Sequence, residues 1–178
     1  LNDLGNVLSQ LERLDDAQAA FSAATTLSPD DANLHNNLGS VLARLDRLPE
    51  AEAAFRHALT IDASFVPALN NLGDLCMRLG HSDEAAQYHC QAFVSGPLID
   101  KPKRMLGIAY YTLNRIAEAA EVYRQWCVDE PHNPVARHLL AACSGQDVPA
   151  RAEDAFVEAI FDEYAQNFDT KLVQSLAY

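Results

Sequence analysis

Apolar residues recur along the chain at the spacing of α-helices, in short segments that come in pairs. In one pair these residues are Leu38, Val41, Leu42 and Leu45, followed by Ala51, Ala54, Phe55, Ala58 and Leu59. Such spacing places each set on one face of a helix. The turn that we predict between the two segments, Arg47-Leu48-Pro49, is short and therefore favours antiparallel neighbours. The pattern predicts an all-α fold of antiparallel helix pairs.

The pair of segments repeats every 34 residues without an insertion. A glycine marks the first helix and an alanine the second, at Gly5, Gly39, Gly73 and Gly107, then Ala17, Ala51, Ala85 and Ala119. Small residues allow two helices to cross closely, while Leu and Phe fill the space between them. Proline follows three of the second helices, because it cannot continue a helix. We predict four units, at 1–31, 32–65, 66–99 and 100–133.

The pattern L-G-x-x-L/Y, then A-x-x-x-F/Y-x-x-A, then P resembles the tetratricopeptide repeat over residues 1–133. The resemblance implies a right-handed α-solenoid, the superhelix of that family, in which the first helices line a concave groove. In that family the groove binds extended peptides or partner helices. The resemblance therefore implies a protein-protein interaction module whose ligand is a protein or peptide.

The positions that face the groove in that family carry repeated amides, namely Asn2, Asn36, Asn37, Asn70 and Asn71. An Asn side chain offers two donors and one acceptor, so a row of amides is able to hold the backbone of an extended peptide. The same residues are also suited to capping helices or to bonding between repeats. The sequence leaves both roles open.

The fourth unit changes character, because Lys101 and Arg104 precede Tyr111 in an otherwise acidic chain. These residues form a candidate anchor for an anionic group of the ligand. The alternative is a solvated helix start whose basic residues balance nearby carboxylates, since so few basic residues are a weak indication.

After residue 133 the repeat becomes incomplete. Residues 134–150 contain a half-unit that we expect to form a capping helix and a linker, because the open end of a repeat stack needs a cover. We expect Trp126, which replaces a small alanine of the other units, to be buried there against Leu140. Residues 151–178 follow as an amphipathic segment, in which we expect a helix at 151–168 with an aromatic stripe at Phe156, Phe161, Tyr164 and Phe168.

The segments 138–145, 148–151, 161–169 and 171–178 together resemble the junction between such repeats and an S-adenosylmethionine-dependent methyltransferase domain in bacterial proteins. The resemblance implies that the repeats recruit a substrate to that enzyme, with Phe161, Tyr164 and Phe168 as a lid over S-adenosylmethionine. The cofactor-binding strand, glycine loop and ribose-binding acid do not occur in this sequence. The chain itself is therefore expected to be non-catalytic, without a cofactor, and a fragment of a longer protein.

Two alternatives remain beside the methyltransferase. The chain is a non-catalytic scaffold in which 151–178 forms a docking helix or a homodimer contact, or it is the repeat region of a protein glycosyltransferase. The Asn-Asn-Leu-Gly segments that begin at Asn36 and Asn70 resemble repeats that precede such sugar transferases.

Charge and composition limit the classes of partner that we expect the chain to bind. The formal net charge of -12 opposes binding to nucleic acid or anionic lipid, and no apolar run is long enough for a membrane span. The four cysteines form no C-x-x-C pair, so we expect no metal site and a reducing, cytoplasmic location. Motifs of nucleophilic, zinc-protease and nucleotide-binding enzymes do not occur.

Overall fold

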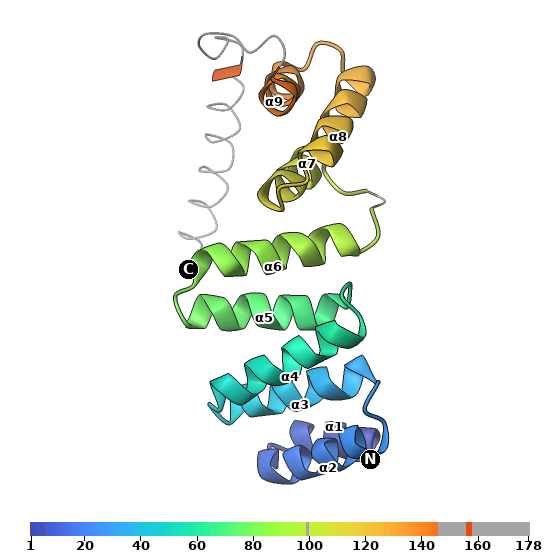
Figure 1. The fold of residues 1–178 in the computed structure, drawn as a ribbon, viewed down its shortest axis with the longest axis vertical. Helices are drawn as coiled ribbons and strands as arrows, with labels where there is room; N and C mark the ends of the chain where they lie inside the picture. Colours follow the sequence, from blue (N-terminus) through green and yellow to red (C-terminus); the bar gives the residue numbers. More distant parts are fainter. Residues whose placement is uncertain (99, 146–155, 158–178) are drawn as a thin grey trace, which may run out of the picture. The chain divides into compact units, whose positions relative to one another are not determined.

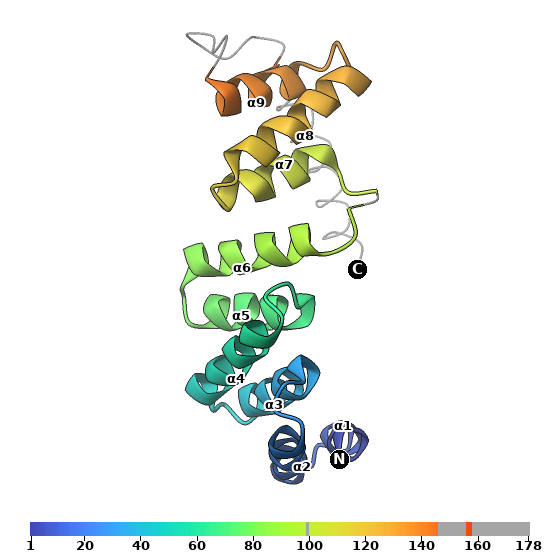
Figure 2. The same cartoon turned by 45° about the vertical axis from the view of Figure 1, so that its right-hand side comes forward.

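A computed structural model describes residues 1–98, 100–145 and 156–157, and the elements found there are helices (Figure 1). Their bounds are α1 Asn2–Gln10, α2 Leu14–Leu27, α3 Ala32–Arg44, α4 Leu48–Ile61, α5 Val66–Arg78, α6 Ser82–Ser95, α7 Lys103–Thr112, α8 Ile116–Asp129 and α9 Pro134–Ser144. Successive helices form antiparallel pairs, as Figure 2 shows for α3 with α4 and for α5 with α6. The predicted all-α fold of helix pairs is confirmed.

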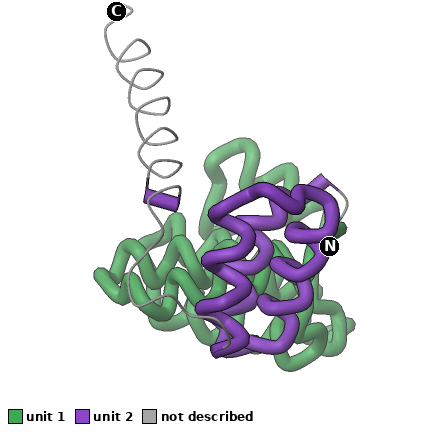
Figure 3. Tube along the Cα trace, turned by 90° about the horizontal axis from the view of Figure 1, so that it is seen from above, with its two compact units in different colours: residues 1–99 green, residues 100–178 purple. Residues whose placement is uncertain are grey.

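The chain divides into two compact units, which Figure 3 distinguishes by colour. Unit 1 is Leu1–Ile99 and holds α1 to α6. Unit 2 is Asp100–Tyr178, and its described helices include α7, α8 and α9. Each unit is considered separately below.

The core of unit 1 is built from an aromatic ring that lies against a glycine of the preceding helix. Phe55 is 2% exposed, and a Cβ atom added to Gly39 would lie 2.6 Å from its ring. Phe21 lies against Gly5 in the same way. A glycine is therefore required for this crossing, since a methyl group would overlap the ring.

The turns inside the helix pairs differ from the prediction. The residues predicted as turn, Leu48 and Pro49, are the first two of α4, because proline lacks only an N–H that has no helical partner in the first turn. The backbone reverses instead just before, around a residue with positive φ such as Asp46, at φ 59°. Glu12, Gly80 and Asn114 occupy the same place in the other pairs.

In unit 2, α9 has a defined start and end. The Asn133 side chain accepts hydrogen bonds from the backbone N–H groups of Val135 and Ala136, and Gly145 ends the helix at φ 65°. Trp126 is half-buried, not buried as predicted. Its indole and the Asn133 amide hydrogen-bond to Glu130, which keeps the tryptophan edge near solvent.

The aromatic stripe predicted within 151–178 has its first residue in the described part. The Phe156 ring stacks on His138 of α9, with ring centroids 3.9 Å apart and an interplanar angle of 20°. Phe161, Tyr164 and Phe168 lie outside the described residues.

Candidate functional site

The amides predicted to line a groove contact one another in unit 1. The Asn37 Nδ2 donates to Asn2 Oδ1 at 3.2 Å, and the Asn71 Nδ2 donates to Asn36 Oδ1 at 2.8 Å. Asn36 is 8% exposed, so its amide is part of the packed interior. Asn70 is exposed. Four of the five amides therefore join first helices of successive repeats, which is the second of the two roles that the sequence left open.

Two arginines join the same helices and were not predicted as functional. Arg44 donates to the Ser9 carbonyl at 3.2 Å and to the Glu12 carboxylate at 2.6 Å. One repeat later, Arg78 donates to the Ala43 carbonyl at 3.4 Å and contacts Asp46 at 3.3 Å. We call these contacts and the amide pairs the inter-repeat polar bonds. The 34-residue spacing of Arg44 and Arg78 was the only indication in the sequence.

The exposed apolar side chains of α7 form a candidate binding surface in unit 2. Met105, Ile108 and Tyr111 are 59%, 44% and 55% exposed, and their spacing of three residues places them on one side of the helix. We call them the α7 apolar face. In the repeat phase they correspond to Asn71, Asp74 and Met77 of α5. The same helix positions are therefore mostly polar in unit 1 and apolar in unit 2.

The basic residues beside this face are engaged. Lys103 forms an ion pair with Asp129 of α8. Lys101 and Arg104 are half-buried, and each has an interaction partner. Lys101 and Arg104 precede Tyr111 in the chain. Their role as an anchor for an anionic group of the ligand stays a prediction.

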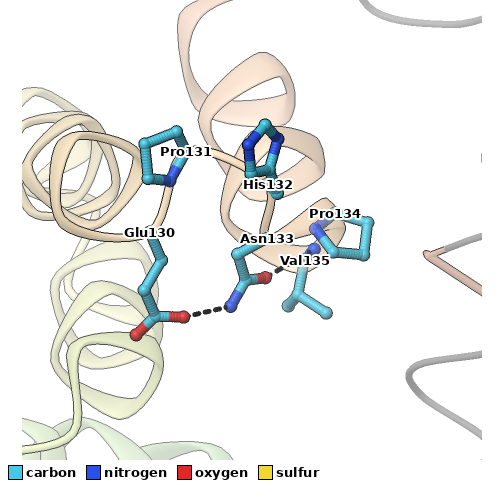
Figure 4. A pocket seen from close by; sticks show the side chains of 6 residues that line it. All are labelled: Glu130, Pro131, His132, Asn133, Pro134 and Val135. Carbon is cyan, nitrogen blue, oxygen red and sulfur yellow. Dashed lines mark hydrogen bonds between the residues drawn. The ribbon is translucent and has the colours of Figure 1, made fainter.

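A surface hollow of about 430 Å3 lies at the turn between α8 and α9 (Figure 4). Glu130, Pro131, His132, Asn133, Pro134 and Val135 line it. Asn133 uses its oxygen to cap α9 and its Nδ2 to bond Glu130 Oε2 at 2.7 Å. The Glu130 and Asn133 side chains of the hollow therefore stabilise the turn. The residues that line the hollow do not form a catalytic arrangement.

Among the described residues, few features support a nucleophilic cysteine or a metal site. Burial raises the pKa of the Cys76, Cys127 and Cys143 thiols above the usual value, so these groups stay protonated at neutral pH. Across residues 1–98, 100–145 and 156–157, His, Cys, Asp and Glu side chains do not gather in threes as a metal site requires. The helices of this part are also too short or too polar to span a membrane.

Comparison with known proteins identifies the repeats. Models described as tetratricopeptide repeat match residues 2–64, 68–92 and 102–125, which together make up more than half of the chain. The predicted tetratricopeptide repeats are confirmed. Among curated proteins, none matches the chain.

A solved structure shares the fold of this chain, and a second gives a weaker match. The structure titled "Functional Characterization of Pseudomonas Aeruginosa pilF" is 23% identical, with a TM-score of 0.51, over 88% of this chain and 73% of that chain. The crystal structure of MamA is 16% identical, with a TM-score of 0.49, over 92% of this chain and 96% of that chain. At 23% identity, the likeness to the first of these structures concerns the fold alone.

Proposed function

We propose that this tetratricopeptide-repeat chain binds a polypeptide partner, and that the α7 apolar face makes the principal contact. The observation that carries the proposal is the exposure of Met105, Ile108 and Tyr111, at 59%, 44% and 55%, on one side of one helix. Adjacent apolar side chains that remain in water are typical of interaction sites. Met and Tyr are also enriched in protein interfaces. Repeat arrays of this kind use extended surfaces to bind proteins.

Polar groups of unit 1 provide a secondary contact in this proposal. Asn70 is exposed, and the Asn37 amide has a second N–H besides the one that it donates to Asn2, whereas the Asn71 amide donates to both Asn36 and Ser40. These donors are suited to the carbonyl groups of an extended peptide. Lys101 and Arg104 add positive charge close to the α7 apolar face along the chain.

A library of random peptides displayed on phage and selected against the chain tests the proposal. We expect the dissociation constant of an enriched peptide to rise at least about tenfold in Ile108→Asp, because a charge would enter the apolar contact. The matched control is Leu27→Asp on α2, where the leucine is 74% exposed. If Ile108→Asp binds as the unchanged chain does, or if Leu27→Asp alone abolishes binding, the proposal fails.

A finer proposal is that the repeats recruit a protein substrate to an S-adenosylmethionine-dependent methyltransferase domain of a longer protein. It rests on the resemblance of the segments 138–145, 148–151, 161–169 and 171–178, of which only the first lies within the described residues. Calorimetry of the intact protein with S-adenosylmethionine, followed by transfer of a labelled methyl group to the selected partner, is the test. Absence of both supports the scaffold or the glycosyltransferase instead.

Self-association through 151–178 and a cytoplasmic location are further parts of the proposal. Light scattering tests the first, since a dimer that uses this segment should dissociate in Phe156→Asp. A monomer at all concentrations for both proteins would remove dimerisation from the proposal.

A further inference from the structure

Two histidines lie side by side at one end of the second helix pair. His35 is near the start of α3 and His57 is near the end of α4, and these helices are antiparallel neighbours (Figure 2). The two ring centroids are 4.1 Å apart, with an interplanar angle of 61°. The His35 side chain is half-buried, and the His57 side chain is exposed to solvent. We call these two residues the histidine pair.

A backbone carbonyl determines which nitrogen of the His35 ring carries the proton. The Pro29 carbonyl oxygen lies 2.8 Å from His35 Nε2, and because a carbonyl only accepts, Nε2 is protonated and donates. In the neutral ring the lone pair is therefore on Nδ1. Histidine ligands of metal ions commonly donate their other N–H to a carbonyl in this way, which fixes the orientation of the ring. The His35 ring is thus oriented as an Nδ1 ligand.

The packing of the repeat does not require histidine at either position. One repeat later the position of His35 is taken by Leu69, which is 2% exposed, and the position of His57 by Gln91, which is half-buried. A leucine therefore fills the same place in the third helix pair. Across the four units, histidines occupy both positions only in the second, since the other pairs are Leu1 with Ala23, Leu69 with Gln91, and Lys103 with Gln125.

The charges around this end of the helix pair favour a cation. Asp31 is the N-cap of α3, Asp62 is the C-cap of α4, and Asp30 lies in the turn that leads into α3. Arg56, the base next to the histidine pair in the chain, forms an ion pair with Glu52 at 2.7 Å. Negative charge at this end raises the local concentration of cations.

We infer that the histidine pair binds a divalent transition-metal ion of the zinc or copper kind, through His35 Nδ1 and a ring nitrogen of His57. Imidazole is the most frequent metal ligand among side chains and suits these ions. Bonds of about 2.0 to 2.1 Å to one ion place two ring nitrogens about 3 Å apart. Neighbouring rings whose centroids are 4.1 Å apart reach this separation by rotation of the exposed His57 side chain.

The histidine pair supplies two ligands, and water supplies the others. An ion enclosed by protein requires three or four side-chain ligands, and the described residues do not gather such a group. The bound ion is therefore exchangeable and joins the start of α3 to the end of α4. The expectation of no metal site rested on the spacing of the cysteines, whereas this site contains only histidines. It lies in unit 1 and does not depend on the function proposed for the α7 apolar face.

Titration of the chain with Zn2+ tests the inference, because this ion has no redox chemistry with the four thiols. Proton magnetic resonance of the six histidine rings is the first readout, and we expect the signals of His35 and His57 to move. Calorimetry is the second readout. We expect the dissociation constant for Zn2+ to rise at least about tenfold in His57→Gln, since even the loss of an outer partner of a ligand costs about tenfold.

Two further variants complete the experiment. His35→Leu introduces the residue found at this position in the third repeat, so the fold should persist while Zn2+ binding weakens as in His57→Gln. His81→Gln is the matched control, because His81 is exposed and makes no side-chain hydrogen bond at the start of α6. The inference is overturned if Zn2+ leaves the His35 and His57 signals unchanged. It is also overturned if His57→Gln binds Zn2+ as the unchanged chain does, or if His81→Gln weakens binding equally.

Discussion

The two units use equivalent positions of the first helix in different ways. In unit 1 the positions of Asn37 and Asn71 bond to the preceding repeat at 3.2 Å and 2.8 Å. In unit 2 the equivalent position is Met105, which is 59% exposed. One repeat motif therefore supports two kinds of side-chain contact at these positions, because the core depends only on the small and aromatic positions of the motif. The remaining positions are free to join repeats or to meet a partner.

The core itself is common to both units. Phe55 lies against Gly39 in unit 1, and Tyr123 lies against Gly107 in unit 2. Both rings are nearly inaccessible, at 2% and 1% exposure. The contact between ring and glycine is thus common to both units, and the two rings differ in their chemistry.

The largest effect is expected from filling these glycine positions. A Cβ atom would lie 2.6 Å from the Phe55 ring in Gly39→Ala and would overlap the Tyr123 ring in Gly107→Ala. We expect each to lower the free energy of unfolding of its own unit by about 2 kcal/mol, because overpacking outweighs the better helix propensity of alanine. Trp126, the single tryptophan, reports on unit 2 by fluorescence, and amide exchange of α3 and α4 reports on unit 1. An unchanged free energy of unfolding in either variant would contradict the close contact between glycine and ring in that unit.

Alkaline pH should separate the two units. Burial raises the pKa of Tyr123 to about 12, whereas the phenol titrates near 10 in the unfolded chain. The folded state therefore holds this proton longer, and the stability that it contributes is lost as pH rises from about 10 to about 12. The loss is roughly 3 kcal/mol at most. Trp126 fluorescence during urea unfolding should show it, and Tyr123→Phe should remove it.

Removal of an inter-repeat polar bond should affect stability only in unit 1. Asn71→Ala leaves the buried Asn36 amide without this partner and should lower the free energy of unfolding by about 1 to 2 kcal/mol. Met105→Ala, at the equivalent position of unit 2, should change it by less than about 0.5 kcal/mol. A larger loss of stability in Met105→Ala would mean that the α7 apolar face contributes to the folding of unit 2.

The smallest effect concerns the third repeat, where His89 takes the place of the aromatic ring. Its imidazole lies against Gly73 and 3.6 Å from Asp74, and its side chain is 40% exposed. His89→Phe should raise the free energy of unfolding by about 0.5 to 1 kcal/mol, because an apolar ring suits the site better than a polar one. Thermal unfolding measures the change, and Asp74→Asn is the control for loss of the carboxylate beside His89 alone.

Much of the fold was predictable from the sequence, because helix formation and helix pairing depend here on residues that are close together in the chain. The helical spacing of apolar residues and the 34-residue phase predicted the helix pairs, and Gly39 predicted a close helix crossing. The start of α7 at Lys103 was not predicted, although α3 and α5 start at Ala32 and Val66 in that phase. Pro102 disfavours the helical conformation of the residue before it, and this local effect delayed the helix.

The candidate site was less predictable because it depends on contacts across repeats. Asn36 and Asn70 occupy the same position of the pattern, yet Asn36 is buried against Asn71 and Asn70 is exposed. The contact of Asn36 is supplied by Asn71 of the next repeat, and the spacing along the chain does not reveal which amide has such a partner. The double role of Arg44, which reaches both Ser9 and Glu12, requires the geometry of two helices and cannot be derived from spacing alone.

The affinity of a library-selected peptide for two paired variants tests the central claim most directly. In Met105→Ala with Tyr111→Ala we expect the dissociation constant to rise at least about tenfold with little change in stability, because the α7 apolar face meets the partner. In Asn37→Ala with Asn71→Ala we expect a smaller loss of affinity, about 1 kcal/mol in total, and a clear loss of stability. An unchanged dissociation constant in the first variant, with loss of binding in the second, would contradict the account.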